Sequence, residues 1–303
     1  FEVVTLPLPT GSNRLILPAI VLWVLVPFTT GELIGHALQQ ADDPFQTAVS
    51  VAAWTAWTVM LVAIAVARPV TLTVGRLGTA GALAAALWAS IELGGRDDAD
   101  AVLILLGVGT AALAAFAFHL PGVGDRFVDG ISYGDEKRFL LRAPGPVLFV
   151  ALVPASVIVI VGLTAGPLLL ADEQWAVGAI VTLGGWAVAW FPLNALHRLT
   201  NRFLVFVPNG LVVHDPTVIR EPVLFVTREI AGLAPAAPDT IATDLTNNAL
   251  GLALELRLTS AVQIPVVTGR SETEEQTVRS LLLAPSRPGA VVTTALERGL
   301  PIA

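Results

Sequence analysis

Six long apolar stretches lie before residue 198, and they limit the possible folds more than any other feature of the chain. A bilayer core about 30 Å thick is crossed by about 20 mostly apolar helical residues. The stretches cover approximately residues 15 to 35, 46 to 67, 77 to 94, 100 to 120, 146 to 170 and 175 to 196. The chain is 54% hydrophobic and only 14% charged. The sequence therefore predicts an α-helical polytopic membrane protein with six transmembrane helices in residues 1 to 198.

The charges in the loops predict the orientation of these helices. Basic residues gather in the connections on one side, at Arg14, Arg68, Arg76, Arg126, Lys137, Arg138, Arg142, Arg198 and Arg202. The opposite connections hold Arg96 with the acidic residues Asp42, Asp43, Asp97, Asp98, Asp100, Asp172 and Glu173. Because basic loops remain in the cytoplasm, both termini are expected there. The basic residues are nearly all Arg, and Ala, Gly, Val and Leu dominate the chain, which indicates a bacterial plasma membrane protein.

The N-terminus and the longest loop carry further expectations. The segment "FEVVTLPLPTGSNR" lacks the features of a cleaved signal peptide, so the first span is expected to act as its own insertion signal. The loop at residues 121 to 146 mixes charged and apolar residues, and we expect it to be an ordered surface segment that docks on another part of the protein. Its acidic residues Asp129, Asp135 and Glu136 lie beside basic neighbours. This mixture favours a salt-bridged loop over a metal site of a membrane enzyme.

After His197 the pattern changes to that of β-strands. Two β-rich runs flank Pro-Asn-Gly in "RFLVFVPNGLVVHD", which predicts a hairpin. In "LALELRLTSAVQIPVV" Leu252, Leu254, Leu256 and Leu258 alternate with polar residues, and Val262, Ile264 and Val266 are expected to form another strand after a short turn. Residues 222 to 227 predict one more strand. The final segment predicts a short helix capped by Ser286 and ended at Gly299. Residues 199 to 303 are therefore expected to be a separate cytoplasmic β-rich domain.

Several strands followed by one C-terminal helix, opening with "LTNRFLVFVPNGLVVHD", resemble a bacterial pleckstrin-homology-like (PH-like) domain. The resemblance covers about a third of the chain. Eukaryotic relatives bind phosphoinositide in a basic pocket, but residues 199 to 303 contain eight Arg, no Lys and ten acidic residues. No cluster of the kind that recognises anionic lipid is present in this segment. The resemblance therefore implies a module for assembly or protein contact.

The composition and the motifs exclude several classes of function. There are no cysteines, so disulfides, thiolate metal sites and thiol nucleophiles are excluded. A net charge of -7 argues against nucleic acid as a partner. Neither a P-loop nor the HExxH and GxSxG motifs occur in the sequence. We therefore expect no cofactor, no metal and no enzymatic activity.

The stretch "GELIGHALQQ" at residues 31 to 40 supplies the one candidate site. Glu32 and His36 are four residues apart, so on a helix they share a face. Glu92, on the third span, is expected at a similar depth just below the outer membrane surface. The candidate polar cluster is therefore Glu32, His36 and Glu92, facing the helix bundle. One alternative is that each side chain simply reaches head groups or water. The other is a paired or cation-binding cluster with one protonated glutamate.

Two functions from different classes remain open on this evidence. The first is a non-catalytic integral membrane scaffold or accessory subunit of a membrane complex, with membrane lipids and either protein partners or further copies of itself around it. The alternative is a small solute or ion transporter or channel with a cytoplasmic regulatory domain. In that case Pro27 and Pro154, which lie inside the first and fifth spans, would kink those helices.

Overall fold

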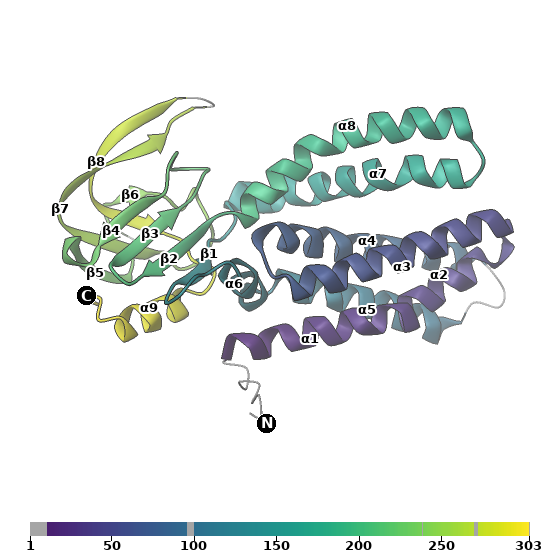
Figure 1. Ribbon diagram of the computed structural model, residues 1–303, viewed down its shortest axis with the longest axis horizontal. Coiled ribbons are helices and arrows are strands. Elements are labelled where there is room, and N and C mark those ends of the chain that lie inside the picture. The colour runs from purple at the N-terminus through teal and green to yellow at the C-terminus, as the bar shows by residue number, and fades with distance from the viewer. Residues whose placement is uncertain (1–10, 96–99, 238, 270–271, 303) are drawn as a thin grey trace, which may run out of the picture. The chain divides into compact units, whose positions relative to one another are not determined.

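The computed structural model describes residues 11–95, 100–237, 239–269 and 272–302 (Figure 1). Contacts divide the chain into two compact units at points other than residue 198. One unit comprises Phe1–Val66 and Val74–Arg126, and the other comprises Ala67–Thr73 and Phe127–Ala303. Two of the six apolar helices therefore belong to the same unit as the β-rich part. The acidic loop residues Asp97 and Asp98 and their neighbour Arg96 lie outside the described residues.

The first half of the chain is helical. Its elements are α1 (Gly11–Val26), a π-helical turn (Pro27–Gly31), α2 (Glu32–Ala37), a 3-10 turn (Leu38–Gln40), α3 (Asp43–Ala65), α4 (Pro69–Gly94), α5 (Ala101–His119) and α6 (Pro121–Asp129). A second π-helical turn (Val147–Ala151) precedes α7 (Leu152–Ala171) and α8 (Trp175–Thr200). Among the described residues, six helical segments are long and apolar enough to cross a membrane, as the sequence predicts. They are Ile16–Gln40, Asp43–Ala65, Pro69–Gly94, Ala101–His119, Leu152–Ala171 and Trp175–Thr200.

Two tryptophans join α1 to α3 where α1 gives way to its π-helical turn. Trp23 Nε1 donates to the carbonyl of Trp57 at 3.2 Å, and Trp57 Nε1 donates to the carbonyl of Trp23 at 3.1 Å. The Trp23 carbonyl lies four residues before Pro27, which has no N–H to give it. The indole of Trp57 therefore supplies the donor that proline lacks, so this backbone carbonyl is paired within the protein and needs no water.

Small residues allow α2, α4 and α5 to approach one another closely. A buried cluster contains Leu33, Ala37, Ala86, Ala89, Leu93 and Ala111. A Cβ atom added to Gly107 would lie only 2.6 Å from Leu33, so this contact requires glycine. Beside it, the buried Thr30 hydroxyl donates to the Gly107 carbonyl at 2.8 Å. These contacts lie within one compact unit and fix α5 against the first span.

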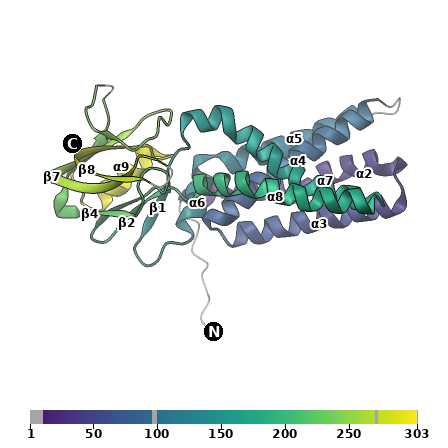
Figure 2. The same cartoon turned by 90° about the horizontal axis from the view of Figure 1, so that it is seen from above.

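Helices α7 and α8 run side by side as a hairpin, as both views show (Figure 1 and Figure 2). A Cβ atom on Gly162 would lie 2.7 Å from the carbonyl oxygen of Gly185, and one on Gly185 would lie 2.5 Å from that of Gly162. A Cβ atom on Gly166 would collide with Thr182. Gly162 and Gly166 form a G-x-x-x-G motif, which permits helix backbones to touch inside a membrane. The two helices are thus held together by backbone contact.

Within the described residues, the β-rich part contains two four-stranded sheets. The first has the order β1-β2-β3-β4 and is antiparallel, with β1 (Lys137–Leu140), β2 (Phe203–Val207), β3 (Gly210–His214) and β4 (Val223–Val226). The second has the order β5-β7-β8-β6, with β5 (Ile230–Pro235), β6 (Thr243–Asp244), β7 (Leu254–Val267) and β8 (Thr273–Leu283). A 3-10 turn (Thr227–Glu229) links β4 to β5, and α9 (Pro288–Glu297) follows β8.

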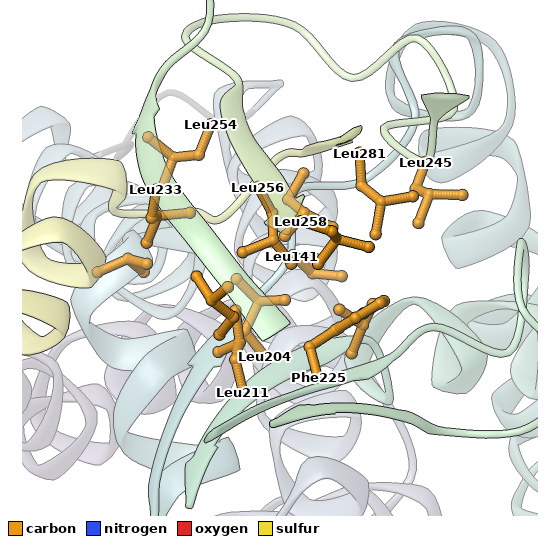
Figure 3. Close-up of a cluster of buried hydrophobic side chains, with 14 of the residues drawn as sticks. Leu141, Leu204, Leu211, Phe225, Leu233, Leu245, Leu254, Leu256, Leu258 and Leu281 are labelled. Carbon is orange, nitrogen blue, oxygen red and sulfur yellow. The ribbon is translucent and has the colours of Figure 1, made fainter. Parts of the chain in front are cut away.

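The inner faces of the two sheets share one hydrophobic core. Figure 3 shows Leu204, Leu211 and Phe225 of the first sheet directed toward Leu256 and Leu258 of the second. All five side chains are buried, and four of them are fully inaccessible to solvent. Val291 and Ala295 of α9 belong to the same core. The alternation that predicted half-buried strands is thus confirmed at Leu254, Leu256 and Leu258.

Three details differ from the sequence expectations. Leu252 lies outside β7 and is 49% exposed, because the strand begins only at Leu254. The expected turn before Val262 is instead an irregularity within one continuous strand, where β7 holds extra residues opposite β8. The N-cap of the last helix is Arg287, one residue after the expected Ser286, and the Arg287 side chain makes no capping hydrogen bond. The end at Gly299 is confirmed, since its φ of 70° is a conformation that glycine adopts easily.

The loop between the fourth and fifth spans contributes a strand to the first sheet. Lys137–Leu140 forms β1, which pairs antiparallel with β2, so this segment is ordered and docked as expected. The sheet therefore includes residues from outside the expected domain 199 to 303. Strands β1 and β2 pair with each other, although helices α7 and α8 lie between them in the sequence. The chain therefore leaves the sheet after β1, forms the α7–α8 hairpin and returns to the same sheet as β2. The loop also contains helix α6, which the sequence analysis did not predict.

Candidate functional site

The predicted pair at the end of the first span is present on α2. His36 Nε2 lies 3.5 Å from Glu32 Oε1, and Gln39 Nε2 lies 3.5 Å from His36 Nδ1. The Glu32 and His36 side chains are 63% and 46% exposed, whereas Leu33 and Ala37 form the buried face of the same helix. The pair therefore lies on the outer face of α2 within its own unit. Such an exposed contact contributes little to stability.

Glu92 lies on α4 next to this region. Its side chain is exposed, and the following residue, Leu93, packs in the same buried cluster as Leu33 and Ala37. The polar residues of both helices thus flank one apolar cluster at the same end of the unit. That Glu32 and Glu92 meet, or share a cation, stays a prediction.

Helix α3 presents a polar face that its own unit does not cover. Thr47, Ser50, Thr55 and Thr58 line a shallow groove along the helix together with Gln46, Val51, Trp54 and Val59. Only 11% of the apolar window of α3 is buried, compared with 28% to 33% for the three other spans before residue 120. Thr55 and Thr58 donate back to the carbonyls of Val51 and Trp54, so their oxygens can still accept hydrogen bonds.

Helix α8 carries a second exposed face near its C-terminal end. Trp190, Asn194 and Arg198 follow each other at intervals of four residues, and Phe191 and Ala195 complete the lining of a groove of about 620 Å³. Trp190 and Phe191 are 63% and 76% exposed. Asn194 Nδ2 donates to the Trp190 carbonyl at 2.7 Å, which holds the amide along this face. The ion pairs among the described residues do not include Arg198.

A buried ion pair fixes the chain where it leaves α8. Arg202 donates through Nε and Nη2 to the two carboxylate oxygens of Asp215 at 2.8 and 2.7 Å, and both side chains are 1% exposed. Arg202 Nη1 also donates to the Arg142 carbonyl at 2.9 Å. The Asp215 carboxylate accepts further bonds from the backbone and hydroxyl of Thr217. Every residue that bonds to this buried pair lies in the same compact unit. The pair therefore connects the segment after α8, the segment after β3 and the segment after β1.

Two of the three acidic loop residues, Asp129 and Glu136, form ion pairs with basic neighbours, as expected for a salt-bridged loop. Asp129 accepts from Lys137 Nζ, from Ser132 Oγ at 3.0 Å and from the backbone of Arg138 at 2.9 Å. Arg138 Nη2 donates to Glu136 at 2.8 Å, and this bond lowers the pKa of Glu136. Among the described residues, no group of three potential ligands is placed to hold a metal ion. The two ion pairs instead hold the turn that leads into β1.

A polar cluster that the sequence analysis missed lies at the end of α8. Thr73 Oγ1 lies 2.8 Å from Thr200 Oγ1 and 3.2 Å from His197 Nδ1. Thr73 and Thr200 are buried, at 4% and 2% exposure. The three residues belong to one compact unit, so they attach the first turn of α4 to the last turn of α8. The signal was absent from the sequence because 124 positions separate Thr73 from His197.

An aromatic contact connects β1, β2 and β3. His214 stacks on Phe203 with ring centroids 4.6 Å apart, and the Arg138 guanidinium lies 5.3 Å from the Phe203 ring centroid. Burial lowers the pKa of His214, Asp215 beside it acts in the opposite direction, and Arg138 lowers the pKa further. The neutral imidazole is therefore favoured in the folded protein.

Comparison with models of protein families, with curated proteins and with solved structures finds no match for this chain. Its function must therefore be argued from the arrangement of its own residues. That arrangement consists of an exposed polar face on α3, an aromatic and basic face on α8, and a β-rich part joined firmly to the α7–α8 hairpin.

Proposed function

We propose that this protein is a non-catalytic scaffold or accessory subunit in a bacterial plasma membrane complex. Its six helices span the membrane, both termini are cytoplasmic, and the β-rich part is a PH-like module for protein contact. Two sheets that share one core and are followed by a C-terminal helix support the PH-like assignment. The pairing of β1 with β2 supports the topology, because it returns the α7–α8 hairpin to the side from which it started.

The observation that carries this proposal is the polar face of α3. Lipid offers no hydrogen-bond partners, so hydroxyl and amide groups on membrane helices usually face other helices. Here the exposed hydroxyl residues Thr47, Ser50, Thr55 and Thr58 line the groove of α3. A helix of a second protein, packed along this groove, would give these groups partners. The proposal therefore assigns α3 as the surface that binds the rest of a complex.

Site-directed cross-linking tests this assignment, because the chain contains no cysteine. Ser50→Cys places one thiol in the groove, and Thr164→Cys is the matched control on α7. Ser50 and Thr164 are both exposed hydroxyl residues on helices, and Thr164 donates to the Ile160 carbonyl. In native membranes a short bifunctional reagent should join the Ser50→Cys protein to one discrete product and leave the control unjoined. Equal products from both positions, or none from Ser50→Cys, would refute the scaffold function.

A transporter or channel is the second candidate, and the two π-helical turns favour it. Pro27–Gly31 interrupts the first span and Val147–Ala151 precedes the fifth. Such turns often occur where helices bend at functional sites. Purified protein that carries a solute across liposome membranes, with flux reduced by Glu32→Gln or Glu92→Gln, would establish this function in place of the scaffold.

A further inference from the structure

We propose that the C-terminal half of α8 binds a membrane phospholipid, with its phosphodiester on Arg198 and its acyl chains along Trp190 and Phe191. This inference rests on the membrane location in the proposed function, and it adds a specific ligand to that location. The site consists of residues from a single helix, so its geometry depends on no other element.

The order of side chains along this face matches the order of groups in a phospholipid. Two exposed aromatic residues come first, then the amide of Asn194, and then the guanidinium of Arg198. Acyl chains contact aromatic rings, ester carbonyls accept hydrogen bonds from an amide, and a guanidinium matches the two oxygens of a phosphodiester. The face is open along the helix, as expected for a surface on which a lipid lies lengthwise with one side still in the bilayer.

The spacing also agrees with the thickness of a membrane interface. Eight residues separate Trp190 from Arg198, which on an α-helix corresponds to about 12 Å along the axis. A bilayer measures about 30 Å across its hydrocarbon core and about 40 to 45 Å with the polar regions. A distance of about 12 Å along the helix axis therefore reaches from the acyl chains near the membrane surface to the level of the phosphates. Trp190 can thus lie among the acyl chains while Arg198 reaches the phosphates.

The charge of Arg198 decides whether a phosphate can bind here. Arg198 lies in the last turn of α8, where the helix carbonyls carry partial negative charge and repel anions. The attraction must therefore come from the guanidinium. Since no ion pair among the described residues includes Arg198, its charge is available to an external anion.

Native mass spectrometry of the purified full-length protein tests the site. The protein is titrated with phosphatidylglycerol, and separately with a monoglycosyl diacylglycerol that has the same acyl chains and no phosphate. Arg198→Gln should weaken phosphatidylglycerol binding about tenfold, as expected for the loss of a charged hydrogen bond. Arg198→Lys should retain part of the affinity, and binding of the glycolipid should not change. Arg228→Gln is the matched control, because it removes one exposed positive charge from the β-rich part.

The outcomes separate this inference from its alternatives. Unchanged phosphatidylglycerol binding by Arg198→Gln, or equal weakening by Arg228→Gln, would refute the site. Displacement of the lipid by inorganic phosphate at comparable concentration would show an anion site in place of a lipid site. The measurement uses purified protein without partners, so it can fail while the cross-linking at Ser50 succeeds, and the reverse is equally possible.

Discussion

At the scale of single residues, the pair of Arg202 and Asp215 is expected to be the most sensitive position in the β-rich part. Removing one partner leaves the other charge buried without compensation, which costs about 3 to 5 kcal/mol. We therefore predict that Arg202→Met lowers the free energy of unfolding by about that amount, measured by thermal or denaturant unfolding of the purified protein. Replacing both residues, as Arg202→Met with Asp215→Leu, should recover much of the loss. A double variant as unstable as the single one would contradict this account.

A second residue-scale prediction concerns His214 and pH. Its folded pKa is lowered, mainly by burial, so the unfolded chain binds the proton more readily than the folded one. Stability is then fully present above the unfolded value of about 6.5 and falls as the pH drops through that value toward the lower folded pKa. We predict that melting temperature decreases over this acidic interval and that His214→Phe, which keeps a ring on Phe203, reduces the decrease. His36, on the exposed face of α2, provides the control as His36→Phe. An equal effect of both substitutions would contradict the role of His214.

At the scale of elements, the glycine contact between α7 and α8 allows a sharp comparison of neighbouring residues. A side chain at Gly185 would press on the Gly162 backbone, whereas a Cβ atom on Gly184 would meet nothing within 4 Å. Gly185→Leu is therefore expected to separate the helices and cost about 1 to 3 kcal/mol. Gly184→Leu should leave stability nearly unchanged. Thermal unfolding in one detergent measures both, and similar losses would show that the helices do not pack through Gly185.

The elements also show how far the sequence could be used to predict the fold. The six apolar helices follow from composition, because a span requires a continuous apolar run. Strand β1 was missed because its four residues include Lys137 and Arg138 and show no alternation of burial. The partners of Arg202 and Thr73 were also missed, because hydropathy patterns contain no information about which distant polar groups will meet. At the candidate site, the spacing of four residues predicted that Glu32 and His36 share a helix face, where their side chains lie 3.5 Å apart, and a meeting with Glu92 stays a prediction.

At the scale of the whole molecule, the proposed topology places two turns on opposite sides of the membrane. One is the turn that precedes β1, and the other is the turn that joins α7 to α8. Tyr133 is 87% exposed in the first turn, and Gln174 is exposed in the second. In this cysteine-free chain we predict that an impermeant maleimide labels Gln174→Cys, but not Tyr133→Cys, in intact cells. Inverted vesicles should reverse the result. Labelling of both positions from the same side would rule out the six-span arrangement.

The position of β1 in the chain imposes an order on biogenesis. Its partner β2 begins about sixty residues later, after the whole α7–α8 hairpin. At about 5 to 20 residues per second, a ribosome needs several seconds to synthesise that interval. In the proposed topology the α7–α8 hairpin enters the bilayer during this time, and β1 remains on the nascent chain without its strand partner. In that topology, insertion of α7 and α8 precedes closure of the sheet, and a stall between the two steps would leave a β-strand edge exposed to chaperones and proteases.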